Sequence, residues 1–440
     1  MSNPYSSLPD HCFWSRGVTW VHPAQMDPMS RAPFMISASD KVATMGSCFA
    51  QHISRRLQAS GFNYFVPEAA PASLSAAEAK AANYGVFSAR YGNIYTVRQA
   101  VQLFDRAFGH ATFDEAWERD DRLVDPFRPQ IDPKGFADLN ALRASRAEHL
   151  AAVRRVFEEA DVLVFTLGLT EAWRSIATGA VYPTAPGVAG VAGGAFDPAL
   201  FEPVNFKVDE VIADLDLFVT KARSVNAGVR IILTVSPVPL KATFEDRHVL
   251  QSTVYSKSVL RVAAQHAADS HDDVVYFPSF EIITGPGGAG RYYAQDLREV
   301  KDLGVAHVMR VFERHFIRGE GADPAAAAAP VFDTGGHSDV ICDEDVLEAA
   351  LQGSRMRRQD APVLAEEGEA LGLSVKEVRD GYRLFLQRAP ESDEVITLHR
   401  RTFSDRRSFA LSLVRSDEFR QGRRPDAPDR FAEWIDWLSA

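Results

Sequence analysis

Short apolar runs alternate with longer amphipathic stretches along the first two thirds of the chain. In the longer stretches the apolar positions recur every three or four residues, which is the spacing of a helix with one buried face. The runs are apolar throughout, as strands are when helices cover both faces of a parallel sheet. The pattern predicts an α/β fold with strands at 41–45, 161–167, 229–235 and 274–277 and helices at 49–59, 143–160, 208–226, 252–269 and 304–317.

Polar or turn-forming residues follow every predicted strand. The carboxyl ends of parallel strands lie at one edge of the sheet, and ligands of such folds bind in the crevice outside that edge. We therefore expect the four strand ends to line one site. The ends are residues 46–48, 168–171, 236–237 and 279.

A stretch rich in alanine, glycine and proline follows the last of these helices and indicates a linker. Beyond it the pattern predicts helices alone, at 346–351, 375–386, 394–402 and 408–419. We expect a sheet domain at 1–318, a linker at 319–342 and a small all-α module at 343–440. The length of 440 residues agrees with more than one folded part, because single cores rarely grow beyond roughly 300 residues.

Composition narrows the classes of partner. With 46% hydrophobic and 24% charged residues, the chain can bury a sizeable core. Its net charge of −11 argues against nucleic acid or an anionic membrane surface as the main partner. The chain has no apolar run of the roughly 20 residues that span a bilayer and no secretory leader pattern, so we expect a cytoplasmic protein.

No cofactor or metal is expected. Cys12, Cys48 and Cys342 are far apart and form no Cys-x-x-Cys pair, so neither a disulfide framework nor a cysteine zinc site is indicated. The chain has no glycine-rich phosphate-binding motif after a strand and no metal-spaced His/Glu pair.

The turn Gly46-Ser47-Cys48 offers two possible nucleophiles where a strand gives way to a helix. A nucleophile there faces the positive end of the helix dipole and nearby backbone N–H groups, which can stabilise a thiolate or a developing oxyanion. The alternative is that Ser47 only caps the helix and Cys48 only fills space.

The stretch MGSCFA resembles the signature of the GSCFA family, which is grouped with the SGNH (GDSL-like) hydrolases. The resemblance covers most of residues 30–317 and includes further blocks. It implies a flavodoxin-like three-layer parallel sheet and a bacterial esterase or O-acyltransferase that acts on a carbohydrate ester through a serine or cysteine. A noncatalytic glycan- or protein-binding module on the same fold is the alternative. The further blocks are YGNIYT (91–96), TLGLTEAW (166–173), SPVP (236–239) and YSKS (255–258).

In the first two blocks the resemblance implies a nucleophile and an oxyanion hole. Aligning the first block on Gly46 without a gap makes Cys48 the nucleophile, whereas a shift of one residue makes it Ser47, so both stay candidates. Gly92 and Asn93 are placed in the oxyanion hole, although Tyr-Gly-Asn is also common in turns.

The third block would add Gly168 and, in place of the family asparagine, Thr170. Glu171 would bind substrate or form a structural ion pair. Ser236 would contact substrate or simply end its strand. Lys257, in the last block, would bind an anion or lie on a solvated helix face.

The resemblance leaves the acid and base open. SGNH enzymes carry a late Asp-x-x-His, and this chain has Asp296 followed by Glu299 at the histidine position. Glu299 itself, His307 and His248 are the candidate bases. If none of them serves, the fold binds without hydrolysing.

The module at the end of the chain has its own resemblance. YRLFLQRAP (382–390) and SDEF (416–419) resemble small helical modules appended to bacterial surface-polysaccharide and glycosyl-transfer proteins. This likeness favours a glycan-related substrate. A module that docks a protein partner or mediates self-association is the alternative.

Overall fold

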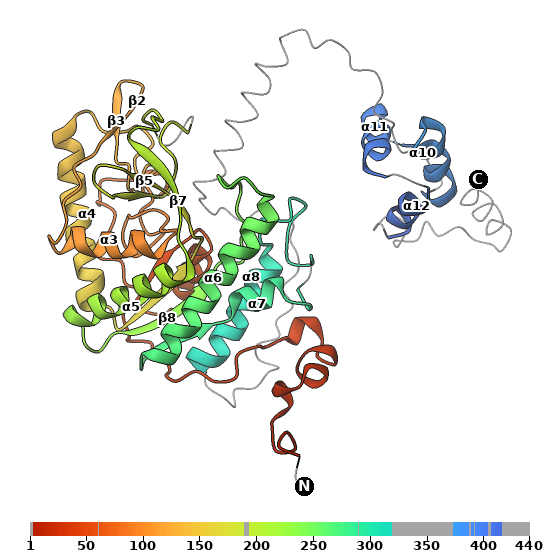
Figure 1. Cartoon of the computed structure of the whole chain (residues 1–440), viewed down its shortest axis with the longest axis horizontal. Coiled ribbons are helices and arrows are strands. Elements are labelled where there is room, and N and C mark those ends of the chain that lie inside the picture. Colours follow the sequence, from red (N-terminus) through yellow and green to blue (C-terminus); the bar gives the residue numbers. More distant parts are fainter. Residues whose placement is uncertain are drawn as a thin grey trace. The chain divides into compact units, whose positions relative to one another are not determined.

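The computed structural model describes residues 3–59, 61–188, 193–288, 290–318, 373–386, 389–390, 392–403 and 406–415. The chain divides into two compact units, Met1–Arg358 and Gln359–Ala440. The predicted linker, residues 319–342, lies outside the described residues, as does the predicted helix at 346–351. Figure 1 shows the elements of each unit.

A parallel four-stranded sheet forms the centre of the first unit, as the apolar runs predict. Its order is β1-β4-β8-β9, and every neighbouring pair is parallel. Tyr64 adds a parallel bridge to Val42 on the open side of β1. The order therefore reverses at β1, between this bridge and β4. The strands are β1 (Val42–Gly46), β4 (Val162–Leu167), β8 (Arg230–Val235) and β9 (Val274–Phe277).

Helices cover both faces of this sheet, and successive strand residues point to opposite faces. Leu163, Phe165 and Leu167 of β4 pack on one face, while Val162 and Val164 pack on the other. The helices on the first face are α3 (Val97–Ala107), α4 (Leu139–Glu159), α5 (Val208–Val225) and α6 (Val249–Ser270). The helices on the second face are α1 (Ala50–Ala59), α7 (Ser279–Thr284) and α8 (Asp302–Phe312), and α8 continues into η4 (Glu313–Arg318).

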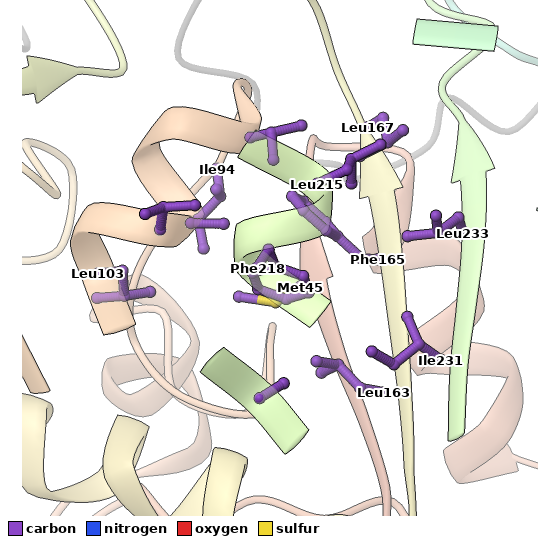
Figure 2. Close-up of a cluster of buried hydrophobic side chains, with 14 of the residues drawn as sticks. Met45, Ile94, Leu103, Leu163, Phe165, Leu167, Leu215, Phe218, Ile231 and Leu233 are labelled. Atoms are coloured by element: carbon purple, nitrogen blue, oxygen red, sulfur yellow. The ribbon is translucent and has the colours of Figure 1, made fainter. Parts of the chain in front are cut away.

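Side chains of α5 pack against β4 on the first face. Figure 2 shows Leu215 and Phe218 of α5 directed at the strand side chains, and the rings of Phe165 and Phe218 lie 5.2 Å apart. Both rings are fully buried. Burying such a side chain contributes about 1.5–3 kcal/mol, so this contact fixes α5 on the sheet.

Two smaller antiparallel sheets are absent from the sequence prediction. One joins β6 (Val181–Tyr182), β5 (Glu171–Ser175) and β7 (Phe201–Asn205) in that order, and the other pairs β2 (Trp117–Arg119) with β3 (Arg122–Val124). A short helix, α2 (Ala76–Ala81), precedes α3. The three-stranded sheet begins four residues after β4 ends, so it stands beside the carboxyl edge of the central sheet.

The described part of the second unit is helical, as predicted. Phe409 is fully buried against Tyr382 and Phe385, and a Cβ on Gly381 would press on its ring. The elements are α10 (Val375–Gly381), η6 (Tyr382–Leu386), α11 (Asp393–Thr402) and α12 (Arg406–Arg415). Across all described residues, no helix combines the length and apolar character needed to cross a membrane.

Candidate functional site

Three chain segments meet at the carboxyl ends of β1 and β4. The amide of Ile94 donates to the carbonyl oxygen of Gly46 at 2.8 Å. The carbonyl oxygen of Tyr95 accepts from the amides of Gly168 and Leu169 at 3.1 and 3.0 Å. The YGNIYT block therefore ties the GSC turn (residues 46–48) to the loop Gly168-Leu169-Thr170, called the GLT loop below, at the point where the strand order reverses. Ligands of open α/β sheets bind at such points.

Two glycines allow this close approach. Gly46 has φ +127°, and a Cβ there would collide with the carbonyl oxygen of Thr166. A Cβ on Gly168 would lie 2.9 Å from the carbonyl oxygen of Tyr95 and 3.2 Å from Cβ of Ser47. The side chain of Ser47 thus lies directly against Gly168, and larger residues are excluded from both glycine positions.

Ser47 and Cys48 are both buried, with 2% and 5% of their surface exposed. Among the described residues, neither Oγ of Ser47 nor Oγ1 of the neighbouring Thr166 has a hydrogen-bond partner. An unsatisfied buried hydroxyl costs about 1–3 kcal/mol, and native proteins contain few such groups. The Ser47 hydroxyl is therefore maintained at a cost in stability, beside a turn that only glycine can form.

Gly92 and Asn93 belong to the YGNIYT segment, which is bonded to both the GSC turn and the GLT loop. Gly92 has φ +68°, a conformation that favours glycine, and Asn93 is 3% exposed. Asn93 lines two small cavities, of about 10 and 20 Å³.

Ser236, after β8, is also buried, and its amide donates to the carbonyl oxygen of Leu167 at 2.8 Å. Ser236 thus braces the end of β4.

The hydroxyl of Thr170 donates to Oδ1 of Asn205 at 2.7 Å. Glu171 accepts from the hydroxyl of Thr243 at 2.7 Å and from the amide of Phe244 at 3.1 Å. Both residues therefore hold neighbouring loops in place. The bonds of Glu171 go to the loop at 243–244.

Asp296 and Glu299 lie on a loop next to the end of β8. Tyr293 and Arg298 tether this loop, because they donate to the carbonyl oxygens of Pro237 at 2.6 Å and Pro239 at 3.1 Å. The exposed Asp296 carboxylate accepts from the amides of Arg298 and Glu299, both at 3.0 Å. No hydrogen bond joins either carboxylate to the hydroxyl of Ser47.

Neither candidate histidine reaches that hydroxyl. His307 binds the hydroxyl of Tyr292 through Nδ1 and the carbonyl oxygen of Met26 through Nε2, both at 2.7 Å. Burial lowers the pKa of His307 to about 4, so the ring is neutral at pH 7. His248 is exposed and caps α6, where Nδ1 accepts from the amide of Leu250 at 3.1 Å.

The YSKS block lies on α6, and two of its side chains form hydrogen bonds with the backbone of the GLT loop. Oγ of Ser256 accepts from the amide of Thr170 at 3.0 Å, and Nζ of Lys257 donates to the carbonyl oxygen of Gly168 at 2.5 Å. Lys257 is 3% exposed, so it does not lie on a solvated face. A sequence signal for this existed, because Lys257 stands one turn before the apolar Leu260 on the buried side of α6.

Replacing Ser256 with alanine is expected to lower the free energy of unfolding by about 1–3 kcal/mol, because the Thr170 amide would lose its acceptor. Ser258 lies on the same helix but is exposed, so its replacement by alanine serves as the control and should change stability by less than about 0.5 kcal/mol. Urea unfolding of both variants measures the difference. Equal values would contradict the role of Ser256 in holding the loop.

A cavity of about 520 Å³ opens beside the GLT loop. Its walls come from Leu169, from the three-stranded sheet and from the loop at 240–246. Trp173 lies in its wall, with the rings of Phe196 and Phe244 at 5.2 and 4.8 Å in edge-on contact. Sequence reasoning missed this cavity because it missed the sheet that forms it. The polar side chains around it are Glu171, Thr184, Asn205, Lys241, Thr243, Glu245 and Asp246.

The converging segments lie within the part of the chain that matches a known family. A model of the GSCFA family matches residues 41–312, which is more than half of the chain and contains the three converging segments and the YSKS block. No curated protein is significantly similar to the chain. On the strength of the family match, the chain belongs to the GSCFA family.

Proposed function

We propose that this protein is an SGNH-like esterase or O-acyltransferase that acts on a carbohydrate ester, with Ser47 or Cys48 as the nucleophile. The observation that carries the proposal is the convergence of the GSC turn, the YGNIYT segment and the GLT loop at the point where the strand order reverses. If the isolated bridge at Tyr64 is counted as a fifth position, the order matches the 2-1-3-4-5 order of flavodoxin-like sheets, which supports the proposal.

The surroundings of the turn favour attack by an oxygen or sulfur atom. The turn precedes the N-terminus of α1, whose dipole stabilises negative charge. The Lys257 ammonium group, bound to Gly168, brings a buried positive charge to the same loop that Ser47 contacts. Both effects lower the energy of a thiolate or of a tetrahedral oxyanion. Gly92 and Asn93 are the oxyanion-hole residues of this proposal, and Glu299 is its carboxylate base.

The 520 Å³ cavity supports a carbohydrate substrate. Binding sites of this size combine apolar and aromatic walls with a few polar groups that set orientation. The apolar face of a sugar ring can pack on Trp173 and Phe244, while its hydroxyls donate to Glu245 and Asp246. Leu169 borders this cavity and its amide donates to the carbonyl oxygen of Tyr95, so the loop at 168–170 connects the cavity wall to the segment that binds the GSC turn.

Turnover of p-nitrophenyl acetate and of acetylated oligosaccharides tests the proposal. We expect Ser47→Ala or Cys48→Ala, whichever removes the nucleophile, to lower kcat/KM by at least about 10³-fold, while the other variant keeps most of its activity. The variants are made in a Cys12→Ala, Cys342→Ala background, because Cys12 is an exposed free thiol that reacts with probes. Labelling with a fluorophosphonate or iodoacetamide, read by intact mass, identifies the residue. Activity and labelling that survive both substitutions would exclude this turn.

A noncatalytic glycan- or protein-binding module is the second candidate. It is favoured by Glu299 at the histidine position and by the engagement of His307 and His248 elsewhere. In that case no ester is turned over, and oligosaccharide binding persists in Ser47→Ala and Cys48→Ala. Binding should be lost in Trp173→Ala under either function, so turnover by the unmodified protein decides between them.

A further inference from the structure

A cluster of buried arginines surrounds a second cavity behind the YGNIYT segment, separate from the carbohydrate cavity. The cavity has a volume of about 20 Å³. Arg106 and Arg128 line it, together with Phe127 and His149, and no carboxylate does. Arg106 is 8% exposed and Arg128 is 2% exposed.

Both guanidinium groups keep an unused donor. Arg128 binds the fully buried Asp125 carboxylate through Nε at 2.8 Å and Oγ of Ser145 through Nη2 at 3.0 Å, but its Nη1 has no hydrogen bond among the described residues. Nη2 of Arg106 likewise has none. The guanidinium group of Arg106 lies 3.8 Å from the centre of the Phe127 ring, which provides contact but no acceptor.

Acidic side chains lie near this cavity but do not line it. Oε1 of Glu68 is 4.0 Å from Nη1 of Arg128, beyond hydrogen-bond distance. Asp125 is shared with Arg146, whose Nη2 donates to it at 2.9 Å. Among the described residues, no carboxylate lies within 4.0 Å of Arg106. Oε1 of Glu115, the other acid near Arg106, accepts from the hydroxyl of Thr178. Burial lowers the pKa of Arg106 to about 10, yet the group stays charged at pH 7. Asp125 and Glu115 attract the Arg106 cation at longer range, but neither forms a hydrogen bond with its Nη2. A buried donor without an acceptor is unfavourable.

The size of the cavity selects the ligand. A cavity of about 10–15 Å³ holds one water molecule. A cavity of about 20 Å³ therefore has room for one water molecule or one monatomic ion, but not for phosphate or sulfate. We propose that this cavity binds one chloride ion, held by Nη2 of Arg106 and Nη1 of Arg128. Because Asn93 and Ile94 form another wall, the ion stabilises the segment that ties the GSC turn to the GLT loop.

Unfolding at constant ionic strength, with gluconate exchanged for chloride, tests the site. Above the dissociation constant, each tenfold rise in chloride should raise the folding equilibrium constant tenfold. Arg106→Leu should abolish this dependence. Arg261→Leu is the matched control, because Arg261 also lies over an aromatic ring, Tyr276 at 3.9 Å, but binds the Glu281 carboxylate at 2.6 Å. The control should keep the full chloride dependence.

Crystals of the unmodified protein grown in bromide supply a second measurement that does not depend on the folding of a variant. An anomalous peak between Arg106 and Arg128 is expected. Unfolding that is identical in chloride and gluconate, or a bromide crystal with only water between the two guanidinium groups, would overturn the proposal. So would a chloride dependence that Arg106→Leu retains in full.

Discussion

Replacing Gly46 with alanine is expected to cost more than about 4 kcal/mol of unfolding free energy, enough to prevent accumulation of folded protein. Two effects add. The backbone at Gly46 has φ +127°, which an L-residue with a side chain rarely adopts, and the new Cβ would collide with the carbonyl oxygen of Thr166. That carbonyl belongs to the backbone of a central strand and already accepts from the amide of Ser47, so it cannot move aside. Soluble yield and urea unfolding measure the effect.

Gly228 provides the matched control for this substitution. It stands in the turn before β8, with nothing within 4 Å of an added Cβ. Gly228→Ala should therefore change stability by less than about 1 kcal/mol. If Gly46→Ala were as stable as Gly228→Ala, the close packing of the GSC turn against β4 would be wrong.

Acid is expected to unfold the protein between pH 6.5 and pH 4. Burial lowers the pKa of His149 and His52 to about 4, from 6.5. Between these values the unfolded chain binds a proton at each ring and the folded chain does not, so the free energy of unfolding falls as the pH falls. Each ring accounts for about 3 kcal/mol, which together is a large part of a typical stability of about 5–15 kcal/mol. His307 acts in the same direction.

Urea unfolding at a series of pH values measures this dependence. Nδ1 of His149 lies 2.8 Å from the Glu68 carboxylate, and a glutamine at this position would keep a donor near that carboxylate. His149→Gln should lower by one the number of protons taken up on unfolding between pH 6.5 and 4, so the free energy of unfolding should change less steeply with pH. The exposed His11→Gln is the control and should leave the slope unchanged. Below pH 4.5, loss of the Glu68 interactions adds to the effect, because hydrogen bonding to His149 lowers the pKa of Glu68 to about 2. Stability that is constant from pH 6.5 to 4 would contradict the burial of these rings.

The central sheet could be predicted because its strands are apolar throughout. β4 and β8 are almost entirely buried, so their composition alone separates them from the helices. The three-stranded sheet could not be predicted in this way. β7 contains Pro203 and is only partly buried, and β5 mixes charged with apolar residues. One missed element did carry a signal, since Thr96 and Gln99 form a capping box at the start of α3.

The candidate site was predicted to the extent that strand ends define it. Family blocks and topology together placed Ser47, Gly92 and Gly168 on neighbouring segments, and hydrogen bonds join those segments in the structure. Long-range side-chain contacts were beyond reach. The sequence alone does not distinguish a His307 bonded to Met26 from a His307 in a catalytic pair, because the two partners are 281 positions apart. The same holds for the arginine cluster, which depends on contacts between distant segments.

The three-stranded sheet of β5, β6 and β7 lies between β4 and α5 in the chain, and its strands hydrogen-bond to one another without joining the central sheet. One wall of the 520 Å³ cavity is thus encoded as a single insert at the rim of the central sheet. Such an insert can lengthen, shorten or change its aromatic residues without altering strand register beneath it. The residues of this cavity wall can therefore differ between related chains while the GSC turn and the strands beneath it stay the same.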